Sequence, residues 1–232
     1  DGVFDTAVAF RGIVFAGARH LDRLTHQAAA IGIGIDAAIV RAGWDAMLAQ
    51  AAPEASILRT TVTRGVAERG LWPAAAPTPT IMVSAAAWSP KLFGRAVRLV
   101  TARIRGNESS PASRLKTLGY LDNILAAREA AGQGADDALF LNCSGGVACT
   151  TIANVCIVSG RALLTPPISE GVNPGIVRAL LLEAAETAGL RPAERPLAPA
   201  DLFSADAVFL TNSVRFLSPA AALDGAVLGE AA

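Results

Sequence analysis

Hydrophobic and polar positions along the first hundred residues alternate in ways that predict strands and helices of one lobe. Residues 2–10 and the IVFAG segment that follows Arg11-Gly12 are rich in strand-forming side chains, so they predict a β-hairpin. Apolar residues then recur at helical spacing between 20 and 33, and Gly32-Ile33-Gly34 predicts the end of that helix. The other predicted elements are a helix capped by Asp36 that runs to Gln50, and strands at 55–64, 80–87 and 96–104.

The second half begins with a polar stretch and continues with a mixture of helices and short strands. The sequence RGNESSPAS at 105–113 fits neither the helical nor the strand period, so it predicts a linker. Residues 117–131 predict a helix, and its expected apolar face carries Leu118, Leu121, Ile124 and Leu125. Residues 173–188 predict another helix, with Asn173 at the cap and Pro174 at the first helical position. Short strands are expected at 138–142, 152–158, 161–165 and 208–212.

These elements do not form a regular βαβ repeat, so the pattern predicts an α+β fold in two lobes. We expect a small N-terminal lobe at 1–104, a linker at 105–113 and a larger C-terminal lobe at 114–232. A lobed chain of this kind offers a cleft in which side chains from both halves act on a ligand.

Composition narrows the class of protein. The 232 residues are 52% hydrophobic, but charge or proline interrupts every apolar run before about 18 residues, so no membrane span is predicted. The start of the chain does not have the pattern of a signal peptide. Net charge is zero and no basic cluster lies among aromatic residues, which argues against nucleic-acid binding. Three cysteines without a CxxC pair argue against a disulfide frame and a metal site, so we expect a cytoplasmic protein without bound metal.

One lysine stands out chemically. Two of the 20 basic side chains are lysine, Lys91 and Lys116, and the others are arginine. Arginine would serve equally well as a surface charge, whereas only a primary amine can form a Schiff base with a carbonyl. Lys116 lies where the predicted linker meets a helix, so it is a candidate nucleophile, with a solvated surface charge as the alternative. Lys91 lies in an irregular loop and is interpreted as a surface charge.

Other positions are candidates for binding anions. The predicted helix start in NPGIVR (173–178) offers unpaired backbone N–H groups that suit phosphate, although an ordinary capped helix explains it as well. Arg23 in HLDRL is a candidate anion ligand or an exposed charge, and Arg64 follows a strand where it can meet a carboxylate. LTNS (210–213) ends a strand with three hydrogen-bonding side chains. Motifs for serine hydrolases, P-loop NTPases and Rossmann dinucleotide sites are absent from the sequence.

Taken in order, several segments resemble the class IV aminotransferase family, the fold-type IV enzymes that use pyridoxal 5′-phosphate (PLP). That family includes branched-chain and D-amino-acid aminotransferases and 4-amino-4-deoxychorismate lyase. The matching segments span nearly the whole chain: DGVFDT (1–6), HLDRL (20–24), VTRG (62–65), KTLGYLDNILAAREA (116–130), DDALFLN (136–142), VACTTIANV (147–155), LLTPPISEGVNPGIVR (163–178) and VFLTNS (208–213).

The resemblance implies a role for each matched site residue. Lys116 would form the Schiff base with PLP and then move the proton, and Arg64 is the candidate for the substrate carboxylate. Tyr120 would lie beside the cofactor ring. The phosphate would be held by Arg23, by the backbone N–H groups of Ile176 and Val177, and by Asn212 and Ser213. Family members are usually homodimers, so the resemblance also implies a homodimer acting on a small amine or amino-acid substrate.

The chain departs from the family pattern at informative positions. The family places a glutamate against the pyridine nitrogen, where VACTT places Cys149. A carboxylate keeps that nitrogen protonated, whereas a buried thiol is ordinarily neutral and does so poorly. Val177 stands where transaminases often have threonine, so a hydroxyl contact is lost and the backbone donor is retained. The chain also starts inside the family's GDGVFET motif, which implies a small lobe with truncated N-terminal strands.

Two reactions of the family fit the sequence. KTLGYLDN and LTNS are more similar to the lyase branch than to the branched-chain transaminases, so the resemblance implies either a 4-amino-4-deoxychorismate lyase-like enzyme or a transaminase. The alternative is a homologue of the fold with weak or no activity. Cys149 and the short N-terminus favour that alternative, while Lys116 and Arg23 oppose it.

Overall fold

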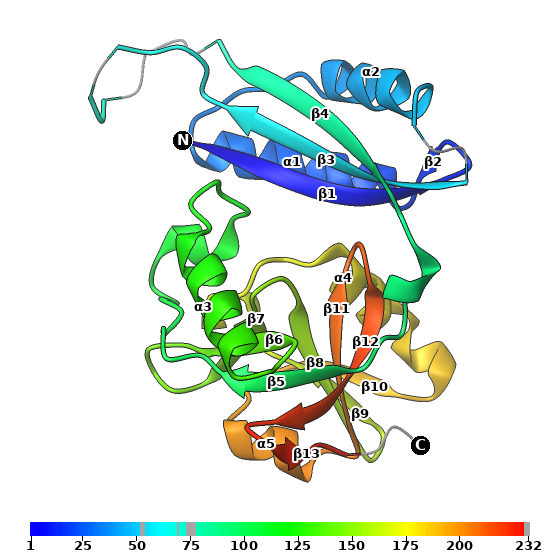
Figure 1. The fold of residues 1–232 in the computed structure, drawn as a ribbon, viewed down its shortest axis with the longest axis vertical. Helices are drawn as coiled ribbons and strands as arrows, with labels where there is room; N and C mark the ends of the chain where they lie inside the picture. Colours follow the sequence, from blue (N-terminus) through cyan, green and yellow to red (C-terminus); the bar gives the residue numbers. More distant parts are fainter. Residues whose placement is uncertain (52–53, 69, 73–77, 230–232) are drawn as a thin grey trace. The chain divides into compact units, whose positions relative to one another are not determined.

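A computed structural model describes residues 1–51, 54–68, 70–72 and 78–229 of the chain. The chain forms two compact units, and each is built of both helices and strands (Figure 1), as the α+β prediction requires. Unit 1 contains residues 1–90 and 115–119, and unit 2 contains residues 91–114 and 120–232. Among the described residues, no helix is both long enough and apolar enough to cross a membrane.

Unit 1 is an antiparallel sheet with two helices. The strands are β1 (Gly2–Phe10), β2 (Ile13–Val14), β3 (Ala55–Thr63) and β4 (Thr80–Ala87), in the order β2-β1-β3-β4. The predicted hairpin is confirmed, because β1 and β2 pair on either side of Arg11 and Gly12. Both turn residues have positive φ, as in the type I′ turns whose twist matches that of the paired strands.

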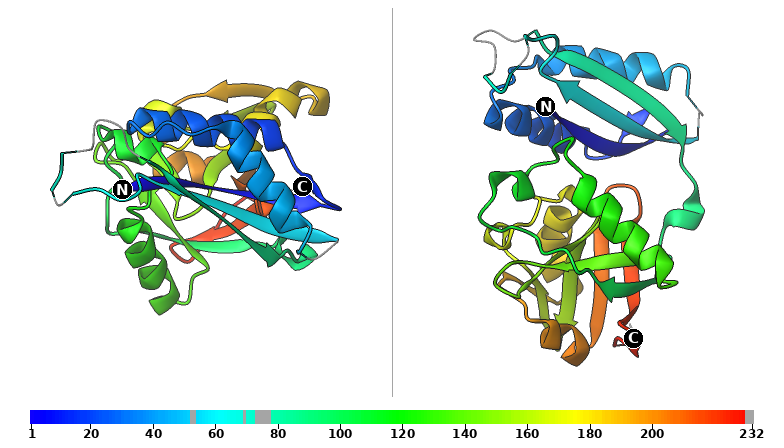
Figure 2. Two further views of the ribbon diagram at one scale, coloured as in Figure 1. Left: turned by 90° about the horizontal axis from the view of Figure 1, so that it is seen from above. Right: turned by 60° about the vertical axis from the view of Figure 1, so that its left-hand side comes forward.

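The helices α1 (Gly17–Ala30) and α2 (Ala37–Leu48) bury their apolar sides with one face of this sheet in a single core. Figure 2 shows both as blue helices running along the strands. The prediction that Asp36 caps the second helix is confirmed, since its carboxylate accepts the Ala38 N–H at 2.8 Å. Because alternate residues of a strand face opposite sides, Val3, Asp5 and Ala9 of β1 face the helices and Phe4 lies on the other face.

Unit 2 is built on a sheet that closes on itself. The strand order is β10-β9-β8-β11-β12-β5-β6-β7, and β7 also pairs with β8. Six strands therefore enclose a barrel core of Leu99, Leu139, Val155, Ile157, Leu210 and their neighbours. The bounds are β5 (Val97–Thr101), β6 (Asp137–Leu141), β7 (Val147–Thr150), β8 (Asn154–Ser159), β9 (Ala162–Thr165), β10 (Arg191–Glu194), β11 (Ala207–Asn212) and β12 (Phe216–Leu223), with β13 (Ala226–Val227) paired to β12.

Three helices pack on this sheet. Ala126 and Ala130 of α3 (Leu121–Gly132) pack against β6, and α4 (Ile176–Ala184) packs against β11. The short helix α5 (Pro199–Ser204) inserts Leu202 into the barrel core. In unit 2, the sequence did not predict α5, β7, β10, β12 or β13, because each is too short or too irregular in its polarity to show a clear period.

The division of the chain differs from the one predicted. β5, assigned to the N-terminal lobe, lies in unit 2 because it pairs in parallel with both β6 and β12. The polar stretch at 105–113 is also part of unit 2, where Glu108 accepts hydrogen bonds from the backbone of Cys143 and Ser144. Residues 115–119 return to unit 1, so Lys116 belongs to the unit opposite to the one predicted. Residues 230–232 of the predicted C-terminal lobe lie outside the described residues.

The predicted helix after the linker is present, but Leu118 lies outside it and the other apolar residues lie on its exposed side. The helix begins at Leu121, four residues later than predicted, and Leu121, Ile124 and Leu125 are 64%, 55% and 42% exposed. The opposite side of α3 is buried instead, through the small side chains of Ala126 and Ala130. Alanine allows the helix to lie close to β6, so packing distance and not side-chain hydrophobicity decides which face is covered.

Candidate active site

Lys116 lies in a short extended segment that adds to the edge of β1. Thr117 forms an antiparallel bridge with Val3, the Phe4 N–H donates to the Lys116 carbonyl at 2.8 Å, and the Leu118 N–H donates to Gly2 at 3.0 Å. Side chains alternate along this pairing, so the Lys116 side chain falls on the Phe4 face of the sheet. Its Nζ lies 4.6 Å from the centroid of the Phe4 ring. The amine is thus held by backbone pairing on the sheet face opposite to α1 and α2.

Arg59 lies on the same face and was missed by the sequence analysis. It is exposed on β3, where it pairs with Thr6, two residues along from Phe4, and its guanidinium carbon lies 3.8 Å from the Phe4 ring centroid. Phe4 therefore brings a lysine and an arginine together through cation–π contacts. The signal was available in the sequence as an arginine within the strand ASILRTTVT, on the same face as alternate threonines, but its neighbour Lys116 comes from 57 positions later in the chain.

Arg23 lies on α1 and faces β1. Its Nε donates to the Asp5 carboxylate at 2.7 Å, and Asp5 also accepts from His20 Nδ1 at 2.6 Å. Gln27, one helical turn after Arg23, accepts the Lys116 backbone N–H at 2.8 Å. The same side of α1 thus carries the predicted anion-binding arginine, Arg23, and contacts the backbone of the predicted nucleophile, Lys116.

Arg64 is fully engaged within unit 1. It forms a bidentate ion pair with Asp1, with N–O distances of 2.9 and 2.6 Å, and it donates to the carbonyls of Ile31 and Gly32. The predicted carboxylate ligand therefore ties the start of the chain to the end of α1. Of the two arginines on β3 and its C-terminal end, Arg59 is the one that shares the Phe4 ring with Lys116.

In unit 2, Cys149 begins a row of side chains across three strands. It lies on β7 opposite Asn154 of β8, and Asn154 in turn lies opposite Thr211 of β11. Directly paired residues of an antiparallel sheet share a face, so these three side chains point to one side. The Thr211 hydroxyl is buried and has no hydrogen-bond partner among the described residues. A polar ligand bound at this row can supply the hydrogen bond that this buried hydroxyl lacks.

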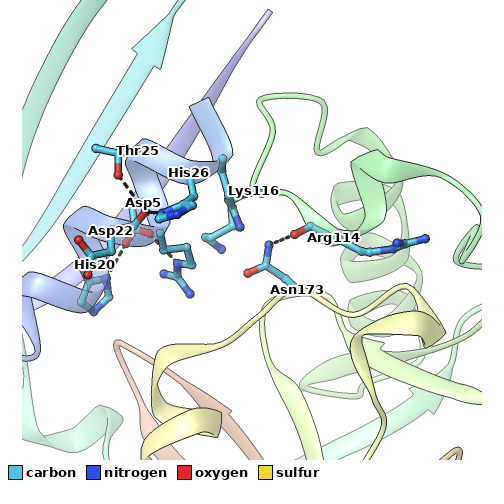
Figure 3. Close-up of polar contacts among 10 residues, drawn as sticks. Asp5, His20, Asp22, Thr25, His26, Arg114, Lys116 and Asn173 are labelled. Carbon is cyan, nitrogen blue, oxygen red and sulfur yellow. Dashed lines mark hydrogen bonds and ion pairs between the residues drawn. The ribbon is translucent and has the colours of Figure 1, made fainter. Parts of the chain in front are cut away.

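The first turn of α4 lies against this row. The predicted cap at Asn173 is wrong: Gly175 is the N-cap, the helix begins at Ile176, and the Asn173 side chain donates to the Arg114 carbonyl (Figure 3). The Asn173 carbonyl accepts a hydrogen bond from Asn154 Nδ2 at 3.0 Å, so Asn173 is held to β8. A Cβ on Gly175 would lie 1.9 Å from Asn154 Oδ1, so any larger residue at 175 would have to displace the Asn154 carboxamide. No side chain caps the helix, so the predicted donors, the N–H groups of Ile176 and Val177, have no side-chain acceptor at the N-cap.

The remaining predicted residues lie at the ends of α3 and β11. Tyr120 is the N-cap of α3, whose Asn123 donates to the Thr151 carbonyl in the turn directly after β7. Asn212 ends β11, and its Oδ1 accepts from the backbone N–H groups of Val214 and Arg215, at 2.9 and 2.7 Å. That carboxamide oxygen therefore shapes the turn that contains Ser213. Unit 2 brings Cys149, Ile176, Val177 and Asn212 together around the Asn154–Thr211 pair.

The described residues thus place a lysine amine and two arginines in unit 1, and uncapped backbone N–H groups and a buried hydroxyl in unit 2. Comparison with known proteins agrees. The family model for amino-transferase class IV matches residues 2–223. The chain belongs to the class IV aminotransferase family and has its fold-type IV structure.

Individual relatives support this assignment to different extents. The chain is 32% identical over 98% of its length to a "Putative branched-chain-amino-acid aminotransferase" of Methanocaldococcus jannaschii, covering 80% of that protein. It is 28% identical over 70% of its length to the aminodeoxychorismate lyase of Bacillus subtilis, covering 55% of that protein. Among solved structures, the branched-chain aminotransferase of Thermoproteus uzoniensis with norvaline matches at a TM-score of 0.92 and 26% identity, over 100% of this chain and 80% of that one.

The family is PLP-dependent, and a hypothetical aminotransferase from Mycobacterium tuberculosis in its PLP-bound form matches this chain at a TM-score of 0.86, with 26% identity over 100% of this chain and 84% of that one. The donors of this chain fit most of that cofactor. The Thr211 hydroxyl, which is buried and has no hydrogen-bond partner among the described residues, and the uncapped start of α4 suit a phosphate. Lys116 is a primary amine, the kind of group that PLP condenses with. A partner for the ring nitrogen is the exception, because Cys149, the residue expected there, has no carboxylate to hold a proton.

Proposed function

We propose that this protein is a PLP-dependent aminotransferase that takes the amino group of a small amino acid, with Lys116 as the catalytic lysine. The observation that carries the proposal is the placement of Lys116 Nζ over the Phe4 ring, with its backbone fixed on both sides by Phe4 and Gln27. A surface lysine needs no such support, whereas a reacting amine must be held in one direction.

Each proposed site residue has a physical task. PLP, when bound, would supply a carbonyl that condenses with amines and a ring that accepts electrons. Lys116 would hold the cofactor through its amine and would move a proton to and from the substrate carbon. Arg23, the N–H groups of Ile176 and Val177, and Asn212 with Ser213 bind the phosphate, and Tyr120 contacts the ring. Arg59 binds the substrate carboxylate, in place of Arg64.

A lyase reaction is the second candidate. The similarity to the Bacillus subtilis aminodeoxychorismate lyase supports it, together with the KTLGYLDN and LTNS segments. Both reactions use the same amine and the same phosphate ligands, so they differ in the substrate that the site admits. Loss of activity in a retained fold is the third candidate, and it is supported by Cys149 alone.

The proposal is tested with the purified protein and PLP. We expect a visible absorption band on adding PLP, and loss of that band when an α-amino acid donor, such as leucine or D-alanine, is added with no keto acid. Release of p-aminobenzoate from aminodeoxychorismate, measured by fluorescence, would identify the lyase instead. A protein that binds no PLP, or binds it and turns over neither class of substrate, would favour the inactive homologue.

Substitutions of Arg59 and Arg64 are expected to have opposite effects on KM and on stability. We expect R59Q to raise KM for the amino-acid substrate about 10- to 100-fold, because a charge-assisted pair with the substrate carboxylate is lost. R64Q should leave KM within about twofold and should lower the thermal midpoint, because Arg64 ties Asp1 to the carbonyls of Ile31 and Gly32. Steady-state kinetics and thermal unfolding of both variants decide this. A larger KM effect from R64Q than from R59Q would return the carboxylate role to Arg64.

We also propose that the enzyme is a homodimer. Leu121, Ile124 and Leu125 form an exposed apolar row on α3, and an i, i+3, i+4 row of this kind is typical of a covered helix face. A sedimentation-equilibrium mass of two chains, reduced to one chain by I124E, is the expected result. A wild-type protein with the mass of one chain at micromolar concentration would contradict it.

A further inference from the structure

A cluster of three polar side chains is buried between β1 and α1 in unit 1. The Asp5 residue is 2% exposed, His20 is 0% exposed, and the Arg23 side chain is 10% exposed. Figure 3 shows Asp5 and His20 directed toward each other. The two carboxylate oxygens are divided between the partners: Oδ1 accepts from His20 Nδ1 at 2.6 Å and Oδ2 accepts from Arg23 Nε at 2.7 Å.

Fold stability alone does not account for this cluster. Desolvating an ion pair costs several kcal/mol per ion, and apolar residues of the same volume often serve the core equally well. The cluster is also incompletely satisfied, since His20 Nε2 has no hydrogen-bond partner among the described residues. Burial raises the pKa of Asp5, but the His20 hydrogen bond and the Arg23 charge lower it by more, so its pKa lies below the ordinary value. Asp5 therefore remains a carboxylate at neutral pH.

The geometry points to Asp5 and His20 as positioning residues that aim the Arg23 guanidinium at the cofactor phosphate, an inference that rests on the proposed function. A guanidinium is planar, so a fixed Nε–H fixes the direction of its two terminal amino groups. His20 holds Asp5 Oδ1, which fixes the rotation of the carboxylate that holds Arg23. Because His20 and Arg23 are three residues apart on one helix, both act on the same carboxylate from the same side.

The same helix side extends this positioning to the nucleophile. Gln27 follows Arg23 by one turn and accepts the Lys116 N–H. Asp5 therefore anchors the helix that carries Arg23, which is proposed to bind the phosphate, and Gln27, which holds the Lys116 backbone. Since the contact with Lys116 is through its backbone, we expect Asp5 to affect phosphate recognition far more than the reaction of the amine.

The test compares PLP with pyridoxal, which has the same ring and carbonyl and lacks the phosphate. Dissociation constants for both are measured by absorption or tryptophan fluorescence with the full chain. We expect D5N to weaken PLP binding about tenfold and to change pyridoxal binding less than twofold, because a charge-assisted hydrogen bond to Arg23 is lost. A merely structural role would weaken both ligands alike.

A double-mutant cycle makes the inference specific to Arg23. If Asp5 acts through Arg23, D5N should have no further effect on PLP binding in an R23Q background. D136N is the matched control, since it removes a carboxylate from the exposed Arg98–Asp136 pair of unit 2 and should change neither ligand. If D5N does not fold, as judged by circular dichroism, H20Q carries the same comparison with an expected loss of about threefold in PLP binding.

The outcomes separate this inference from the function on which it rests. Equal losses for PLP and pyridoxal, or an undiminished D5N effect in the R23Q background, would overturn the positioning role while the PLP enzyme stands. If the wild-type protein binds PLP no more tightly than pyridoxal, the phosphate site fails, and both the proposed function and the positioning role fail with it.

Discussion

Replacing Lys116 with alanine is expected to reduce kcat by on the order of 10⁴-fold or more, because one side chain supplies both the covalent attachment and the proton transfer. The structure gives a reason to expect no rescue by a neighbour. Arg59, the other cation over Phe4, carries a guanidinium and not a primary amine, so it does not form a Schiff base. The measurement is turnover of amino donor, with borohydride reduction of the PLP-treated protein followed by peptide mass spectrometry.

The chain supplies a matched control for this experiment. Lys91 is the second of two lysines and is exposed in a short 3₁₀ turn, so K91A should retain activity and labelling. In the wild-type protein the label should be found on the peptide that contains Lys116. Labelling of Lys91, or residual activity of K116A above about 1% of wild type, would mean that Lys116 is not the catalytic lysine.

Local elements were predictable from the sequence where their signals are local. The hairpin at Arg11-Gly12 and the Asp36 cap depend on neighbouring residues, and both predictions are confirmed. The place of β5 was not predictable in the same way, because its parallel partners β6 and β12 lie far along the chain. The exposure of the apolar row on α3 was not predictable, because hydrophobic periodicity identifies an apolar face without showing what covers it.

The residues of the candidate site also differ in whether local sequence or distant contacts reveal them. Lys116 was identified because its chemistry differs from that of every arginine in the chain. Arg59 was missed because its neighbour Lys116 comes from a segment that pairs with β1, and only the folded unit shows that pairing. Asn154 was missed for a related reason: its importance lies in its contacts with Gly175 and Asn173, which belong to a different element.

Cys149 leads to the second large prediction. It is partly buried on β7, packed beside the α3–β6 core and opposite Asn154. In the proposed site this position would face the cofactor ring nitrogen, where a carboxylate would hold a proton and strengthen electron withdrawal from the substrate carbon. We therefore expect C149E to raise kcat for amino transfer about 10- to 100-fold, as an electrostatic contribution of this type commonly does.

A neutral variant distinguishes charge from shape. C149Q places a side chain of nearly the same size as glutamate at this position and carries no acidic proton, so it should leave kcat within about threefold of wild type. A new carboxylate in a partly buried place also costs about 1–3 kcal/mol of folding stability if it has no partner in the absence of cofactor. Thermal unfolding should therefore show C149E less stable than wild type without PLP, with the difference reduced by saturating PLP. If C149E and C149Q have equal kcat, proton retention at the ring nitrogen does not limit the rate of this enzyme. Cys149 would then fit a reaction that needs less electron withdrawal by the cofactor, because its substrate has a good leaving group.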